Sequence, residues 1–338
     1  MDLEERVRRY ASEVTGGGPL LLTASVERFE AGNRHAVYRV SSGDIEDATG
    51  AVVVRVSLSD APAERAQAER EAMVLKRLGG AGAPSLYDFQ AESRWFRAPA
   101  MCMQFVDGDQ RELSHAGTDD VERLGAVVAS IHNVSIDDFA PSFGGATTLA
   151  TYVDERLALT AAYRPRLRNP LPPSAASRVE HAFALVEGTS GLARREACFR
   201  SDDGLVLLHG DVADGNILWA SEPVLIDWEY TRLGDPADEV AYIFGQHGLT
   251  VTQREAFWAG YRRATDQAKV DHMVERASWW EPVLLLGSAL WWLERWSRSA
   301  NAEDAAVVDP FAPKPPSYYL DQATRRLDRF DGAITKSL

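Results

Sequence analysis

The stretch from Leu205 to Glu229 constrains the fold more than any other part of the chain. It reads LVLLHGDVADGNILWASEPVLIDWE. An apolar run enters a polar turn that ends at Asn216, a short strand turns at residues 220–223, and a second apolar strand leads to Asp227. Apolar runs separated by turn-forming residues predict a β-hairpin. The hairpin should bring Asp211, Asn216 and Asp227 together at its open end.

These three side chains suit one kind of chemistry. Magnesium takes hard oxygen ligands and is commonly held by one or two carboxylates together with substrate phosphates. Phosphoryl transfer also needs a carboxylate that is not on the metal and that accepts the proton of the attacking hydroxyl. Kinase catalytic loops place an Asn five residues after this Asp, which is the spacing of Asp211 and Asn216. The stretch therefore predicts a phosphoryl-transfer site.

Two motifs in this stretch, HGDVADGN and IDWE, resemble the aminoglycoside phosphotransferase and choline kinase superfamily. Members of that superfamily carry an H-G/N-D-x-x-x-x-N loop and a following I-D-F/W-E segment. Residues 234–238 (GDPAD) and the stretch 257–261 also look like the family, so the resemblance extends over most of the chain. It implies an α+β, bilobal protein-kinase-like fold. A small β-rich nucleotide-binding lobe would occupy residues 1–106, and a larger, mostly helical lobe with the catalytic loop and acceptor cleft would occupy residues 107–338.

The resemblance also assigns roles within the motifs. It implies that Asp211 is the catalytic base and that Asn216 and Asp227 hold magnesium. His209 is a second candidate for the base, but in such loops this histidine usually packs and supports the loop. Asp214 is either a third metal ligand or a turn residue, a position that Asp favours.

The first hundred residues are expected to be rich in β-structure. Short β-branched runs at residues 36–40 and 51–56, separated by turn-forming residues, predict a hairpin. Residues 64–78 contain strong helix formers with apolar residues at helical spacing, which predicts a helix. Two more strands are expected at residues 85–89 and 100–106.

Arg55 lies in this lobe where a kinase strand presents a lysine that pairs with phosphates. Glu71, on the predicted helix, shares a face with Leu75 and Leu78 and should point into the protein. A buried carboxylate needs a cationic partner. We therefore expect an Arg55–Glu71 ion pair at the nucleotide site, and an exposed strand arginine is the alternative.

The remaining nucleotide contacts are expected in two loops. Residues 31–35 (AGNRH) occupy the place of a phosphate-covering turn, although they lack the G-x-G-x-x-G pattern of protein kinases. Residues 103–106 look like a hinge whose backbone meets the nucleotide base, which leaves ATP versus GTP open. The candidate contacts in these loops are Asn33, Arg34, His35, Gln104 and Val106.

The second part of the chain has a mainly helical pattern. An amphipathic helix is expected at residues 121–132, and S/T-x-x-E patterns at 177–180 and 252–255 indicate capped helix starts. The apolar stretch 277–293 is short for a membrane span and contains a glutamate and a proline. We expect it to form a buried helix hairpin.

Five of the nine tryptophans lie in the stretch 279–296. An aromatic box with Glu281 or Glu294 would suit a protonated amine or a quaternary ammonium group through cation–π attraction. Packing in a helical core is the alternative and the favoured interpretation. The family resemblance places the acceptor cleft among these helices. The candidate acceptor contacts are Glu229, Trp280 and Trp292.

Charge and cysteine content bear on partners and location. The net charge is −14, with −2 in residues 1–106 and −12 in the remainder. Nucleic acid is not an expected partner, because phosphate backbones bind clustered Lys and Arg. The acidic part would attract a cationic ligand, or it is an ordinary acidic surface. Cys102 and Cys198 have no zinc-site spacing, and the N-terminus does not read as a signal peptide, so we expect a cytoplasmic protein without a membrane partner.

Together these observations predict a magnesium-dependent small-molecule kinase. It would transfer the γ-phosphoryl group of ATP or GTP to a hydroxyl of an amine-bearing alcohol, an aminoglycoside-like antibiotic or a sugar, and a choline- or ethanolamine-type kinase is one specific form. A catalytically silent nucleotide-binding regulator is disfavoured because all three chemical residues are present. A protein kinase is disfavoured because the glycine loop and the D-F-G and A-P-E segments are missing. The acceptor, the donor base, a resistance or metabolic role and the oligomeric state stay open.

Overall fold

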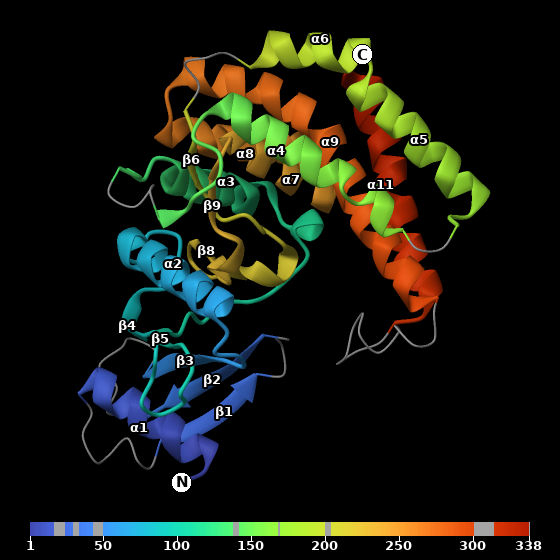
Figure 1. Ribbon diagram of the computed structural model, residues 1–338. Helices are drawn as coiled ribbons and strands as arrows, with labels where there is room; N and C mark the ends of the chain where they lie inside the picture. Colours follow the sequence, from blue (N-terminus) through green and yellow to red (C-terminus); the bar gives the residue numbers. More distant parts are fainter. Residues whose placement is uncertain are drawn as a thin grey trace. The chain divides into compact units, whose positions relative to one another are not determined.

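The computed structural model of the chain is drawn in Figure 1. It describes residues 1–16, 24–29, 34–42, 50–137, 142–167, 170–199, 204–300 and 314–337. The chain divides into two compact units. The first comprises residues 1–111, 126–143 and 209–232, and the second comprises residues 112–125, 144–208 and 233–338. The lobe boundary expected after residue 106 stays a prediction.

A five-stranded antiparallel sheet forms the base of the first unit, in the order β1-β2-β3-β5-β4. Its strands are β1 (Ser25–Phe29), β2 (His35–Ser41), β3 (Ala51–Ser57), β4 (Leu86–Gln90) and β5 (Ala100–Gln104). The hairpin predicted from the β-branched runs is confirmed as β2 and β3. The other two expected strands are β4 and β5, within two residues of their predicted bounds.

The two faces of this sheet have different neighbours. Val52, Val54 and Cys102 pack with Val7 and Tyr10 of helix α1 (Leu3–Thr15), which the sequence analysis did not predict. Side chains alternate along a strand, so Arg55 in β3 points to the opposite face. That face meets α2 (Pro62–Leu78), the helix predicted at residues 64–78. The alternation thus directs one arginine of an apolar strand toward α2.

The hairpin predicted between Asn216 and Asp227 also belongs to the first unit. It consists of β7 (Ile217–Trp219) and β8 (Pro223–Leu225), paired antiparallel as predicted. The short 3-10 turns η5 (Asp214–Asn216) and η6 (Trp228–Tyr230) lie at its open end. A separate two-stranded sheet pairs β6 (Val206–Leu208) with β9 (Arg232–Gly234).

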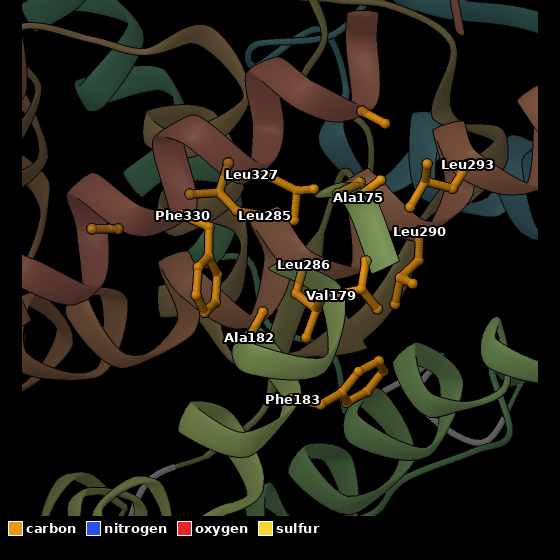
Figure 2. Close-up of a cluster of buried hydrophobic side chains, with 13 residues drawn as sticks. Ala175, Val179, Ala182, Phe183, Leu285, Leu286, Leu290, Leu293, Leu327 and Phe330 are labelled. Carbon is orange, nitrogen blue, oxygen red and sulfur yellow. The ribbon is translucent and has the colours of Figure 1, made fainter. Parts of the chain in front are cut away.

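Helices make up most of the second unit. Among the described residues they are α4 (Leu149–Ala161), α5 (Pro173–Glu187), α6 (Thr189–Cys198), α7 (Pro236–His247), α8 (Val251–Ala264), α9 (Gln267–Ser299) and α11 (Pro316–Ser337). The 3-10 turns η2 (Leu113–His115) and η4 (Arg164–Arg166) also belong to this unit. Helix α3 (Thr118–His132) has its first part in the second unit and the remainder in the first. A core of α5, α9 and α11 side chains, among them Phe183, Leu286 and Phe330, is drawn in Figure 2. The predicted helix at residues 121–132 is confirmed as the main part of α3.

Two predictions about these helices are wrong. The stretch 277–293 is not a hairpin, because α9 runs through it without a break and contains Pro282. A proline inside a helix costs one hydrogen bond and creates a clash. Here Pro282 is buried and α9 carries buried residues along its length, so tertiary packing outweighs the local break.

The two predicted capping boxes also fall in the wrong places. Helix α5 begins at Pro173, with proline in its first turn, so Ser177 lies inside the helix. The N-cap of helix α8 is Thr250, two residues before the predicted cap at position 252, and Gln253 completes the capping box. An S/T-x-x-E pattern also occurs within helices, so it does not fix a helix start by itself.

The expected α+β, protein-kinase-like fold is confirmed by the sheet-based N-terminal part and the largely helical C-terminal part. In the part of the chain that the structure describes, no helix is both long and apolar enough to cross a membrane.

Candidate active site

Strand pairing places Asn216 next to Asp227. Ile217 lies opposite Leu225 in the hairpin, and one step further out the Ile226 N–H donates to the Asn216 carbonyl oxygen at 2.9 Å. The side chains of Asn216 and Asp227 therefore leave neighbouring backbone positions at the open end of the hairpin. This is the juxtaposition that the spacing of the two motifs predicts.

The loop before the hairpin is held by His209, which is fully buried. The Asp211 N–H donates to Nδ1 of His209 at 3.2 Å, so Nε2 carries the proton and donates to the Ile226 carbonyl oxygen at 2.9 Å. The ring also packs edge-on against Trp228. Both ring nitrogens are thus hydrogen-bonded to backbone groups, which favours the supporting role of His209 over the role of general base.

Asp211 is tied to Asn216 within the same loop. Nδ2 of Asn216 donates to the carbonyl oxygen of Asp211 at 2.9 Å and to its Oδ2 at 3.1 Å. The amide oxygen Oδ1 of Asn216 therefore points away from Asp211. The loop can pass this point only with glycine at 210, because its φ is +89° and a Cβ there would clash with the Tyr230 carbonyl oxygen.

Asp227 has a strained backbone and an accessible carboxylate. Its φ of 63° lies in the left-handed region, which costs a non-glycine residue about 1–3 kcal/mol. Its side chain is 44% exposed, and Oδ1 lies 3.5 Å from Nη1 of Arg55. Loss of hydration on the protein-facing side raises the pKa of Asp227, and Arg55 only partly offsets this. Such strain is typical of functional sites.

The expected ion pair between Arg55 and Glu71 is present. Nη2 of Arg55 donates to Oε2 of Glu71, which is 2% exposed. The other carboxylate oxygen of Glu71 accepts the Trp228 N–H at 3.2 Å. Arg55 is buried and also faces Asp227, so the alternative of an exposed strand arginine is wrong. The pair joins β3 and α2 to the residues that follow the hairpin.

The turn expected to cover the phosphates is only partly described, because residues 31–33, Asn33 included, lie outside the described residues. Nη1 of Arg34 lies 3.7 Å from Oε2 of Glu229 and donates to Oε1 of Gln67 at 3.4 Å. Burial, together with Arg55 and Arg34, lowers the pKa of His35 to about 3, so this imidazole is neutral. Loss of hydration, followed by the nearby Asp227 carboxylate, raises the pKa of Glu229.

The segment in which a hinge is expected is hydrogen-bonded to the β7–β8 hairpin and its preceding loop. Gln104 is held at β4, with its N–H donating to the Ser85 carbonyl oxygen at 2.9 Å, and Val106 follows the end of β5. Beyond it, Asp109 and Trp219 exchange backbone hydrogen bonds of 3.2 and 2.8 Å. Nε2 of Gln110 donates to the Gly215 carbonyl oxygen at 2.6 Å. The segment that would meet a nucleotide base thus touches the loop that carries Asn216.

Two of the expected acceptor contacts lie in the second unit. Trp280 is fully buried, and its Nε1 donates to Oδ2 of Asp235 at 2.7 Å. Trp292 packs against Tyr318 and Tyr319 of α11 and lies under the guanidinium of Arg326. These contacts favour core packing, the interpretation preferred from sequence, over an open aromatic box. Glu229 is the one acceptor candidate within the first unit.

The oxygen atoms at the open end of the hairpin fit a hard cation. Asn216 offers an amide oxygen, and Asp227 offers a carboxylate that is partly open to solvent. One carboxylate and one neutral oxygen, completed by phosphates and water, are a common way to hold Mg²⁺. These two residues could hold the ion, with Asp211 beside them.

Sequence reasoning did not single out two residues that contact this region, Gln67 and Gln110. Nε2 of Gln67 donates to the Glu229 carbonyl oxygen at 2.9 Å. The signal for Gln67 was available, because it lies four residues before Glu71 and shares its helical face. Gln110 gives no such signal, because its partner is a backbone carbonyl 105 residues away.

Solved structures share this fold. A candidate aminoglycoside phosphotransferase from Ralstonia eutropha superposes with a TM-score of 0.64 at 14% identity, covering 97% of this chain and 98% of that chain. A choline kinase from Cryptosporidium parvum gives 0.63 at 15% identity, covering 98% and 97%. A spectinomycin phosphotransferase, solved with ADP and spectinomycin, gives 0.58 at 13% identity and covers 93% of each chain. At these identities the likeness is one of fold.

Sequence comparison identifies the family. No curated protein matches the chain in sequence. The sequence model of the phosphotransferase enzyme family, however, matches residues 25–272, which is well over half of the 338 residues and includes both motifs of the hairpin. The chain therefore belongs to the phosphotransferase enzyme family.

Proposed function

We propose that the protein transfers the γ-phosphoryl group of ATP or GTP to a hydroxyl of a small, amine-bearing alcohol, an aminoglycoside-like antibiotic or a sugar. The observation that carries this proposal is the arrangement of Asp211, Asn216 and Asp227 at one end of a hairpin, with the Arg55–Glu71 pair attached to it. Membership of the phosphotransferase family gives the reaction class.

Each residue of the arrangement has a role in this proposal. Asp211 orients the acceptor hydroxyl and accepts its proton, with its carboxylate fixed by the Asn216 amide. Asn216 and Asp227 would hold Mg²⁺, which neutralises charge on the phosphates as the γ-phosphoryl group is transferred. Arg55, kept in place by Glu71, presents its guanidinium to the nucleotide phosphates. Arg34 and His35 would contact the phosphates, and residues 104–106 would meet the base.

The acceptor class follows from charge. The part of the chain beyond residue 106 carries a net charge of −12, which favours a cationic acceptor over an anionic one. Glu229 adds a carboxylate two residues after Asp227. Solved proteins of the same fold include an ethanolamine kinase, a choline kinase and a spectinomycin phosphotransferase. A triphosphate donor further implies that the protein works in the cytoplasm.

A transfer assay tests the proposal. Purified protein is incubated with Mg²⁺ and γ-labelled ATP or GTP, in separate reactions with amino alcohols, aminoglycosides, macrolides and neutral sugars. We expect label on at least one acceptor, more with the amine-bearing compounds, and none without Mg²⁺. Tight nucleotide binding without transfer to any acceptor would instead support a nucleotide-binding regulator. Equal transfer to neutral sugars would contradict the charge argument.

A further inference from the structure

The backbone on both sides of Asp227 is fixed by hydrogen bonds. On the side of the hairpin, the Ile226 N–H donates to Asn216 and the Ile226 carbonyl oxygen accepts from His209, each at 2.9 Å. These two bonds define where the chain enters Asp227. The backbone after Asp227 needs hydrogen bonds of its own, because the left-handed φ of 63° turns the chain away from the strand direction.

Helix α2 holds this part of the backbone through two side chains one helical turn apart. Oε1 of Glu71 accepts the Trp228 N–H at 3.2 Å, and Nε2 of Gln67 donates to the Glu229 carbonyl oxygen at 2.9 Å. Residues four apart lie on one face of a helix, so both can reach the same backbone segment. One acceptor and one donor on α2 therefore match the two ends of the segment 228–229.

Gln67 is held in the orientation that this contact needs. Its Oε1 accepts a hydrogen bond from Nη1 of Arg34 at 3.4 Å, so its Nε2 faces Glu229. A flipped amide would turn Nε2 toward the guanidinium and Oε1 toward a carbonyl oxygen, which places like partial charges together at both ends. Glu71, in contrast, divides its carboxylate between Trp228 and Arg55. Gln67 is the member of the pair whose backbone contact is not shared with Arg55.

We propose that Gln67 is a positioning residue for Asp227. By holding the Glu229 carbonyl oxygen, it keeps the turn η6 in place and so keeps the Asp227 carboxylate beside Asn216. The inference rests on the proposed function, because its consequence is tighter magnesium-dependent nucleotide binding. Gln67 itself touches neither the metal site nor the hydroxyl, so its loss should affect affinity for the Mg²⁺–nucleotide more than the acceptor step.

Gln67→Glu is the sharpest variant, because it keeps the acceptor for Arg34 and removes the donor to Glu229. Gln67→Met removes both polar contacts at similar length and adds no charge. We expect both variants to raise the Mg²⁺ concentration for half-maximal nucleotide binding by about fivefold to tenfold, the effect of losing one hydrogen bond that orders a site. The KM for the acceptor and the melting temperature should stay near the wild-type values.

Gln267→Glu is the matched control, because it makes the same change in the first turn of α9, where Gln267 bonds Asp271 on the surface. It should bind nucleotide as the wild type does. Calorimetric titration of nucleotide at graded Mg²⁺ gives the affinities, and crystal structures of the two Gln67 variants report the Asp227 backbone.

The outcomes separate the two proposals. If the wild type binds Mg²⁺–nucleotide and both Gln67 variants match it, or if Asp227 keeps its left-handed conformation and place in both, the positioning role is overturned while the proposed function stands. If the wild type neither binds nor transfers, the proposed function fails and the positioning role fails with it. A shift in Gln67→Glu alone would reflect the added charge and would also overturn the inference.

Discussion

Two carboxylate–arginine clusters in this protein differ in how much of the carboxylate is accessible to solvent. The Asp227 cluster, in the first unit, consists of Arg55, Glu71 and Asp227. The Asp235 cluster, in the second unit, consists of Asp235, Arg276 and Trp280. Each joins a helix to a segment distant in sequence. Only the first has a carboxylate that reaches solvent.

The Asp235 cluster is closed. Asp235 is fully buried and caps α7, with Oδ1 accepting the Ala237 N–H at 3.0 Å. Its two oxygens also accept from Nε of Arg276 at 3.2 Å, and Oδ2 accepts from Trp280 at 2.7 Å. Its carboxylate is therefore fully used by the protein.

Asp227 combines a strained backbone with a side chain that is 44% exposed. The difference indicates that the Asp235 cluster stabilises the fold, whereas the Asp227 cluster keeps a carboxylate accessible to solvent at a cost in backbone strain.

The largest effect is expected at Asp211, the neighbour of the Asp227 cluster. Asp211→Asn should lower turnover by about 10²–10⁴-fold, the usual contribution of a general base, while thermal stability stays unchanged. Asp214→Asn, in the same loop, is the control and should have little effect if Asp214 is a turn residue. Wild-type turnover in Asp211→Asn would remove the base assignment.

Asp235→Ala should lower the free energy of unfolding. The substitution removes one partner of a buried ion pair with Arg276 and should cost about 3–5 kcal/mol of unfolding free energy. Urea denaturation measures this cost. Asp266→Ala removes an exposed aspartate cap from α9, and no arginine pairs with it among the described residues, so it should cost only about 1 kcal/mol. Equal costs for the two variants would show that the Asp235 cluster is an ordinary helix cap.

Asp227→Asn, in contrast to Asp235→Ala, should affect nucleotide binding more than the stability of the fold. It should weaken magnesium-dependent nucleotide binding by at least about tenfold, since even residues behind a metal ligand have effects of that size. Binding without Mg²⁺ should change little. Glu222→Gln, at the tip of the same hairpin, gives the baseline for a lost surface charge. Unchanged affinity in Asp227→Asn would exclude this residue from the metal site.

Arg55→Lys tests whether one cation must face two carboxylates. A lysine ammonium is a compact point charge and cannot contact Glu71 and Asp227 as the guanidinium does. We expect nucleotide affinity to fall by roughly fivefold, the value of about one hydrogen bond. Arg28→Lys on the exposed edge strand β1 should bind normally. An equal loss in the two variants would mean that the effect is one of net charge.

The smallest expected effect concerns pH. The pKa of Asp227 is raised in the folded protein, so ionising it there costs more than in the unfolded chain. At neutral pH Asp227→Asn should therefore be more stable than the wild type, by no more than about 1 kcal/mol because the side chain is partly exposed. The gain should disappear as the pH falls from the raised pKa toward the ordinary Asp value of about 3.9. Denaturation curves measured from neutral pH down to the ordinary pKa of Asp test this prediction. A stability gain of Asp227→Asn that persists at the low end of this range would contradict the proposed origin.

The sequence predicted correctly those features that depend on residues close together in the chain. The β7–β8 hairpin and the β2–β3 hairpin follow from apolar runs and turn residues close together in the chain. The Arg55–Glu71 contact could be expected because helical periodicity turns Glu71 inward and the family resemblance places Arg55 where a kinase strand presents its lysine. Such terms act over a few residues, so they can be read from the chain.

Other features needed the tertiary structure. The S/T-x-x-E patterns misplaced the starts of α5 and α8, because a helix start depends on what the helix packs against as well as on its cap. Helix α1 was missed although Asp2 caps it and Gly16 ends it, because its buried face is only Val7, Tyr10 and Ala11. This short apolar face is buried only by packing against the sheet, which the local sequence does not reveal.

The sequence by itself determined the chemistry of the site: which carboxylates and which amide lie at the end of one hairpin, and which arginine faces them. The tertiary structure decided that α9 continues through Pro282, that Trp280 belongs to the core, and that Asp227 adopts a left-handed backbone. The reason is one of energy. Each of these three states is locally unfavourable or locally ambiguous, and only burial and hydrogen bonds from residues far along the chain outweigh the local preference.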